Sequence, residues 1–116
     1  MTKKELLETY NPGFSYKLPI KFKQKWVESL RKEEYAQVKR ALVVENEGYC
    51  CLGVAAKVCE VGDHKLYDTY YLTGVNSKRI PKILRENKSI NTWLSDLNDL
   101  YELTFPQIAM LIEKYL

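Results

Sequence analysis

The sequence has no run of about 18 consecutive apolar residues, the length that a helix needs to cross a membrane. Its first residues include lysines but no apolar stretch behind them, so we expect no signal peptide. Cysteine is scarce, with only Cys50, Cys51 and Cys59, and the first two are adjacent. Adjacent cysteines do not form an ordinary disulfide, and the number of cysteines is odd. The sequence therefore predicts reduced thiols and a cytoplasmic protein that does not bind a membrane.

Groups for metal binding and catalysis are equally scarce. The one histidine, His64, follows the cysteines without the C-x₂₋₄-C pairs that are typical of structural zinc. A Cys–His nucleophile would need His64 against Cys50 or Cys51, together with an oxyanion hole, for which the sequence has no other sign. The carboxylates Asp96 and Asp99 are three residues apart, a spacing more typical of a solvated helix face than of an acid–base pair. We expect structural thiols, no metal, no cofactor and no enzymatic activity.

What the chain does have is an ordinary globular composition. It has 116 residues, 46% hydrophobic and 28% charged, which suits one domain over residues 1–116. The net charge of +3 is uneven, because residues 1–40 carry ten basic and five acidic side chains. This charge density is below that of most nucleic-acid-binding domains, but it favours an anionic partner for the first third of the chain.

Apolar residues at helical spacing predict a mostly helical chain. Phe22, Trp26 and Leu30 recur every four residues, which predicts a helix over residues 20–33 with one buried face. Thr104 and Gln107 have capping-box spacing at the start of the last helix, which we expect to pack in the core. Further helices are expected over residues 3–9, 52–61 (ended by Gly62), 82–87 and 93–101 (capped near Asn91-Thr92).

Short β-favouring runs occur near the middle of the chain. Residues 42–44 and 49–52 flank a loop with Gly48, which predicts an antiparallel hairpin. The Tyr-rich residues 65–73 predict another strand. Gly53 predicts either a close backbone approach or the approach of a ligand at the start of the following helix. The fold class is therefore α+β: a single small domain, mostly helical, with a short antiparallel hairpin or sheet.

Basic and aromatic side chains gather between residues 21 and 40. At about 100° per residue, Lys21, Lys25 and Lys32 share a stripe away from the apolar face. Phosphate-bearing ligands require this combination, with charge for the phosphate and a ring for the base. The same residues also suit a merely solvated helix. The predicted ligand-binding residues are Lys25, Arg31, Tyr35, Gln37, Lys39, Arg40 and Tyr49.

Four motifs occur together along the chain. They are the Trp-containing helix through Lys25–Gln37, Y-C-C-L-G-V at Tyr49–Val54, L-N-D at Leu97–Asp99, and T-F-x-x-I-A within Thr104–Glu113. Together they resemble a family of small, mostly uncharacterised proteins of bacteriophages and prophages. The family outline has a Gly-rich turn where this chain has Val38-Lys39-Arg40, and a different segment over residues 63–77. The resemblance implies a phage or mobile-element setting, supplies no reaction, and adds Asn98 and Asp99 to the predicted site.

These features lead to a hypothesis of function by binding. We expect a phage-type accessory protein in the host cytosol that inhibits or sequesters a host defence component, with a nucleotide signal as one candidate. The partner is then an anionic small molecule or a host protein. Two alternatives remain open: a nucleic-acid-binding accessory factor with strong salt dependence, and a protein–protein interaction module that uses exposed tyrosines.

Overall fold

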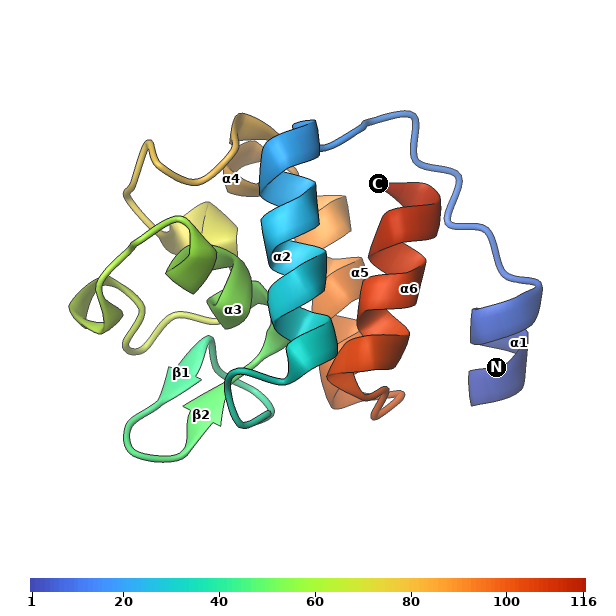
Figure 1. The fold of residues 1–116 in the computed structure, drawn as a ribbon, viewed down its shortest axis with the longest axis horizontal. Coiled ribbons are helices and arrows are strands. Elements are labelled where there is room, and N and C mark those ends of the chain that lie inside the picture. Colours follow the sequence, from blue (N-terminus) through green and yellow to red (C-terminus); the bar gives the residue numbers. More distant parts are fainter.

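Six α-helices and one two-stranded antiparallel sheet make up the computed structural model, which describes all 116 residues (Figure 1). The predicted α+β class is confirmed, with a small hairpin near the middle of a mostly helical chain. None of the helices combines the length and the apolar character needed to span a membrane. The elements are α1 (Lys3–Glu8), α2 (Ile20–Lys32), β1 (Val43–Val44), β2 (Gly48–Tyr49), α3 (Cys51–Val58), α4 (Lys82–Glu86), α5 (Lys88–Asp99) and α6 (Phe105–Tyr115).

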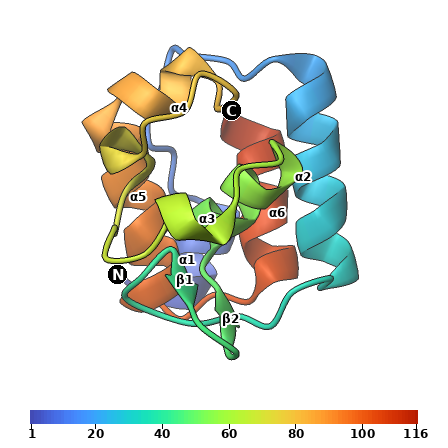
Figure 2. The same ribbon diagram turned by 90° about the vertical axis from the view of Figure 1, so that its left-hand side faces the viewer.

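Helices α2 and α6 lie side by side along one flank of the molecule (Figures 1 and 2). The predicted apolar face of α2 is confirmed, since Trp26 and Leu30 are fully buried. The predicted capping box of α6 is confirmed as well, with the Thr104 hydroxyl accepting from the Gln107 N–H. Each large apolar side chain that becomes buried in this way contributes about 1.5–3 kcal/mol. The pairing of the two helices is therefore a main source of stability.

Helix α3 lies between the α2–α6 pair and α5 (Figure 2), and its first six residues are buried. Gly53 is required there, because a Cβ at this position would lie 1.9 Å from the Leu42 carbonyl oxygen. The predicted close backbone approach is thus confirmed. The predicted stop at Gly62 is wrong. The chain turns left-handed already at Glu60 (φ 61°), and the Val61 N–H bonds the Ala56 carbonyl, because Val61 must enter the core.

The predicted strand over residues 65–73 is wrong. This segment contains two 3₁₀ turns, Asp63–Lys65 and Leu72–Gly74, joined by a left-handed residue, Asp68 (φ 58°). Leu66 and Leu72 are buried, whereas Tyr67 and Tyr70 between them are exposed and Tyr71 is partly buried. No neighbouring strand is available to form a β-ladder with these residues. Burial of the two leucines therefore determines the conformation of the segment, and the β-propensity of the tyrosines does not.

Helix α5 begins earlier than the sequence predicts, because Asn87 caps it by accepting from the Ile90 N–H. Asn91 is not a cap but a fully buried residue, whose side chain bonds Leu84, Asn87 and Leu72 main-chain groups. Leu100, just beyond the end of α5, is 70% exposed. The apolar residues that α5 buries are Ile90, Leu94 and Leu97.

The N-terminal arm, residues 1–19, runs from α1 along the α5–α6 side before it enters α2 (Figure 1). Two hydrogen bonds hold it near the C-terminus. The Tyr115 hydroxyl donates to the Tyr10 carbonyl at 2.6 Å, and the Leu18 N–H donates to the Leu116 carbonyl at 2.8 Å. The arm also buries Leu6. It is therefore part of the folded domain.

Candidate functional site

The predicted site residues do not form a single surface. Lys25 and Arg31 both lie on α2, but six residues at 100° each place them about 120° apart around the helix. Arg31 reaches across to α6, where its guanidinium forms an ion pair with Glu113 at 2.6 Å. Lys25 is exposed and forms no ion pair. The two helix residues of the predicted site therefore face different neighbours.

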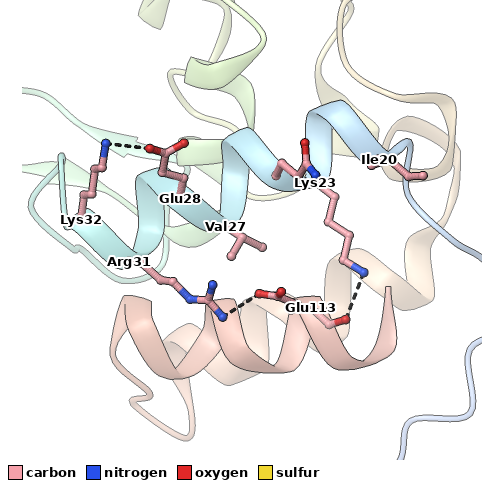
Figure 3. A pocket seen from close by; sticks show the side chains of 8 residues that line it. Ile20, Lys23, Val27, Glu28, Arg31, Lys32 and Glu113 are labelled. Atoms are coloured by element: carbon pink, nitrogen blue, oxygen red, sulfur yellow. Dashed lines mark hydrogen bonds and ion pairs between the residues drawn. The ribbon is translucent and has the colours of Figure 1, made fainter.

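A groove lies between α2 and α6, on the Arg31 side of α2 (Figure 3). Its volume is about 480 Å³. In Figure 3, Lys23 and Arg31 both extend from α2 towards Glu113, and the Lys23 ammonium donates to the Glu113 carbonyl at 3.0 Å. We call this site the α2–α6 groove. It is lined by Ile20, Lys23, Gln24, Val27, Glu28, Arg31, Lys32 and Glu113.

Most charges of the α2–α6 groove are already paired. Besides Arg31 and Glu113, Lys32 and Glu28 form an ion pair at 2.7 Å. The hydrogen bond and charge of Lys32 lower the pKa of Glu28, and Glu28 raises the pKa of Lys32 in turn. Both ion pairs are largely exposed, so each adds little to the free energy of folding. A binding partner can therefore replace either of the two carboxylates at low energetic cost. Lys23 is the only cation of the groove without a carboxylate partner.

Two other predicted residues, Gln37 and Asn98, meet in a hydrogen-bond network. The Gln37 amide donates to the Asn98 side-chain oxygen at 3.0 Å and to the Leu103 carbonyl at 2.9 Å. The same Asn98 oxygen accepts from the Cys51 N–H, and the Asn98 amide donates to the Val38 carbonyl at 2.8 Å. Asn98 is fully buried. Its side chain therefore holds the loop after α2 against the start of α3.

Three of the recognised motifs join in this network. The Trp26 indole N–H donates to the Cys51 carbonyl at 3.0 Å, while the Cys51 N–H donates to Asn98. Trp26, Gln37, Cys51 and Asn98 are called the Asn98 cluster below. Their contacts link α2, α3 and α5 within the core. The sequence does not predict the hydrogen bonds that join Trp26, Cys51 and Asn98, because these residues are far apart along the chain.

The thiols of this region are protonated at neutral pH. Burial raises the pKa of Cys50 to about 12 and also raises the pKa of Cys51 well above its usual value. Burial also raises the pKa of Cys59 to about 11. All three cysteines are free, and the Cys51 thiol lies 3.4 Å from the Leu94 carbonyl. No group of three or more His, Cys, Asp or Glu side chains is arranged to hold a metal ion. Cys50 and Cys51 are buried and Cys59 is partly buried, and the raised pKa values keep these thiols protonated and poorly nucleophilic.

Tyr35 and Tyr49, both predicted as binding residues, lie in contact. Their rings pack edge to face with centroids 4.9 Å apart. The Tyr49 hydroxyl donates to Asp63 at 2.7 Å, and Lys57 pairs with the same carboxylate at 2.9 Å. Burial and the hydrogen bond to Asp63 raise the pKa of Tyr49 to about 12. Burial works against the charge of Asp63, but the bonds from Lys57 and Tyr49 outweigh it and lower the pKa of Asp63. Sequence reasoning missed Lys57 and Asp63, since no local pattern relates them to Tyr49.

Of the remaining predicted residues, Lys39 and Asp99 lie near the end of α5. Lys39 forms an ion pair with Glu102 at 3.0 Å, whereas Arg40 is exposed and forms no ion pair. Asp99 accepts from the Ser95 hydroxyl and from the Asn98 amide. A small pocket of about 230 Å³ opens here. Its lining includes three of the predicted residues, Gln37, Lys39 and Asn98.

Comparison with known proteins adds a family match over part of the chain. Residues 18–73, just under half of the chain, match the family model of a domain of unknown function (DUF8296). The matched segment contains α2, the hairpin and α3 but not Asn98. Neither a curated protein nor a solved structure matches the chain. Fold and geometry define a small α+β domain with a groove between two of its helices.

Proposed function

We propose that this chain is an accessory binding protein of the bacteriophage or prophage type. It acts without chemistry of its own, in the host cytoplasm, by inhibiting or sequestering a host component such as a defence protein. The partner binds in the α2–α6 groove. The observation that carries the proposal is this groove, which combines an aliphatic floor with a charged rim on an accessible face of the domain (Figure 3).

The lining of the groove favours a protein partner. Val27 provides an aliphatic floor and Ile20, at one end, is 73% exposed. Protein interfaces combine an apolar centre with a polar rim in this way. No aromatic ring lines the groove, whereas recognition of a nucleobase commonly uses one. A host protein that presents an aliphatic side chain and a carboxylate fits best, because Lys23 lacks an acidic partner.

A nucleotide or another anionic small molecule is the second candidate. The volume of about 480 Å³ lies within the usual range of small-molecule sites. A phosphate could accept charge-assisted hydrogen bonds from Lys23, Arg31 and Lys32. It would first have to displace the exposed carboxylates that pair with Arg31 and Lys32. Nucleic acid is less favoured, because two of these three cations are paired with carboxylates and a polyanion needs an uninterrupted basic track.

Site-specific photo-crosslinking in bacterial cells tests the protein partner. A photoreactive amino acid replaces Gln24 in the groove, and a matched variant carries it at Lys82, an exposed residue of α4. We expect one host protein to crosslink at position 24 and not at position 82. In calorimetry with the purified partner, Ile20→Glu and Lys23→Glu should each weaken binding at least tenfold, while Lys82→Glu should not.

Calorimetry with small molecules separates the two candidates. The ligands are cyclic dinucleotides, mononucleotides and short oligonucleotides, each at two salt concentrations. Saturable binding of a nucleotide that Arg31→Ala removes would favour the second candidate over the first. Binding only of long oligonucleotides, with a steep salt dependence, would indicate a nucleic-acid-binding factor. If crosslinking and calorimetry both find no partner in the groove, the proposal is wrong.

A further inference from the structure

A second cavity lies between the N-terminal arm and α5, and it shares no lining residue with the α2–α6 groove. Its volume is about 490 Å³. Three aromatic side chains line it, Tyr10 and Phe14 from the arm and Trp93 from α5. Two charged residues of α5, Lys88 and Asp96, line it as well. We call this cavity the arm pocket.

The aromatic wall of the arm pocket is held in place by packing. The Phe14 and Trp93 rings meet edge to face, with centroids 5.3 Å apart and an interplanar angle of 77°. Tyr115 supports Trp93 from α6 in a second edge-to-face contact, at 6.4 Å. The same Tyr115 bonds the Tyr10 carbonyl through its hydroxyl. The rings are therefore pre-positioned, which lowers the entropic cost of binding a ligand between them.

Asp96 is a carboxylate without a partner. The residue is partly buried, and its carboxylate forms no ion pair and accepts no hydrogen bond from the protein. Burial, with a smaller contribution from the charge of Asp99, raises the pKa of Asp96. Trp93 lies three residues before Asp96, so the two side chains are neighbours on one face of α5. A negative charge that lacks a counter-ion thus lies beside an aromatic wall.

We propose that the arm pocket binds an organic cation, an alkylammonium or guanidinium group, with Asp96 as its counter-ion and Trp93, Phe14 and Tyr10 as its walls. Aromatic faces attract cations through the ring quadrupole, and an adjacent carboxylate adds direct charge attraction. The cation is either a free small molecule or the side chain of a lysine or arginine in a partner. This inference is independent of the proposed function, because the two sites share no residue.

Lys88 makes the charge preference testable. It lies eight residues before Asp96, about 12 Å away along α5, at the opposite end of the arm pocket. A cation at Asp96 is weakly repelled by Lys88, whereas an anionic ligand such as a nucleotide would be attracted by it. Removing the charge of Lys88 therefore has opposite effects on the two ligand classes.

NMR titration of the full-length protein with defined probes tests the proposal. The probes are tetramethylammonium chloride, arginine amide, a neutral glycine peptide with one central lysine, and AMP, with sodium chloride as the reference. Trp93 and Trp26 are the only two tryptophans, and the Trp26 indole N–H is bonded to Cys51 in the core. We expect at least one cation to shift the Trp93 indole signal in a saturable way, while the Trp26 signal stays in place.

Charge variants complete the test. Asp96→Asn should weaken cation binding at least tenfold, and Lys88→Gln should strengthen it by a small factor. Asp68→Asn, at an exposed carboxylate outside the pocket, is the matched control and should change nothing. Tighter binding of the peptide than of tetramethylammonium would identify the natural ligand as a side chain of a partner protein. Tighter binding of tetramethylammonium would identify it as a free small-molecule cation. The proposal is overturned if no cation gives a saturable shift, if Asp96→Asn leaves the affinity unchanged, or if only AMP binds and Lys88→Gln abolishes it.

Discussion

The Asn98 cluster contains Gln37 and Asn98, and the α2–α6 groove contains Arg31. The sequence predicts all three as ligand-binding, but the fold uses them differently. In the Asn98 cluster the Asn98 side chain is fully buried and bonds Gln37, Val38 and Cys51. In the α2–α6 groove, Arg31 and Glu113 are each about half exposed and form one ion pair. The availability of a polar side chain thus depends on burial and on partners within the protein, not on residue type.

This difference has energetic consequences. Removing one member of a buried hydrogen-bonded pair leaves its partners unsatisfied, at a cost of about 1–3 kcal/mol for each group. An exposed ion pair contributes about 0–1 kcal/mol. Substitutions in the Asn98 cluster should therefore act on the free energy of unfolding, whereas substitutions in the groove should act on binding. The predictions below test that separation.

Asn98→Ala should have the largest effect. It leaves the Cys51 N–H and the Val38 carbonyl without their side-chain partner and creates a small cavity. We expect the free energy of unfolding to fall by about 3 kcal/mol, measured by urea denaturation followed by circular dichroism. Lys82→Ala is the exposed control and should stay within about 0.5 kcal/mol of the parent. A loss below 1 kcal/mol for Asn98→Ala would show that the cluster is not the structural centre described above.

Two cysteine substitutions sharpen the contrast between core and periphery. Cys51 is fully buried in the cluster, whereas Cys59 is only partly buried at the end of α3. Cys51→Ala should cost about 1–2 kcal/mol and Cys59→Ala less than about 1 kcal/mol. Metal analysis of the purified parent should find no stoichiometric zinc. Equal costs, or zinc that either substitution removes, would contradict the assignment of these thiols as structural.

The Tyr49–Asp63 contact predicts a specific loss of stability at alkaline pH. The pKa of Tyr49 is about 12 in the folded protein, above its usual value of 10. The folded state therefore retains this proton while the unfolded state releases it, so the contribution is complete below pH 10 and is lost between pH 10 and 12. Denaturation at several pH values should show a steeper alkaline decline for the parent than for Tyr49→Phe. Parallel declines would indicate that burial and the bond to Asp63 do not raise the pKa of Tyr49 in the folded protein.

Arg31→Ala should have the smallest effect on stability. Its ion pair with Glu113 is exposed, so we expect the free energy of unfolding to change by less than about 0.5 kcal/mol. Binding of the groove partner should fall at the same time. Lys39→Ala, which removes another exposed ion pair outside the groove, is the matched control for both measurements. A large loss of stability for Arg31→Ala would remove the distinction between the two regions.

Local signals in the sequence were sufficient where a single segment contains the whole motif. The apolar spacing of α2, the capping box of α6 and the hairpin turn each depend on residues a few positions apart. The boundaries of α5 and the Tyr-rich segment could not be predicted in this way. Asn91 is buried because Leu72, Leu84 and Asn87 supply partners for its amide, and no local pattern indicates these.

The sequence by itself determined the α+β class, the positions of most helices and the need for glycine at position 53. Only the tertiary structure decided which predicted binding residues are accessible. The hydrogen bond between Gln37 and Asn98 joins residues 61 positions apart in the sequence, and the ion pair between Arg31 and Glu113 joins residues 82 positions apart. The arm pocket likewise forms only when the N-terminal arm lies against α5. The physical reason is that a hydrogen bond, an ion pair or an aromatic wall between distant segments depends on how the helices pack, and helix packing is a property of the whole chain.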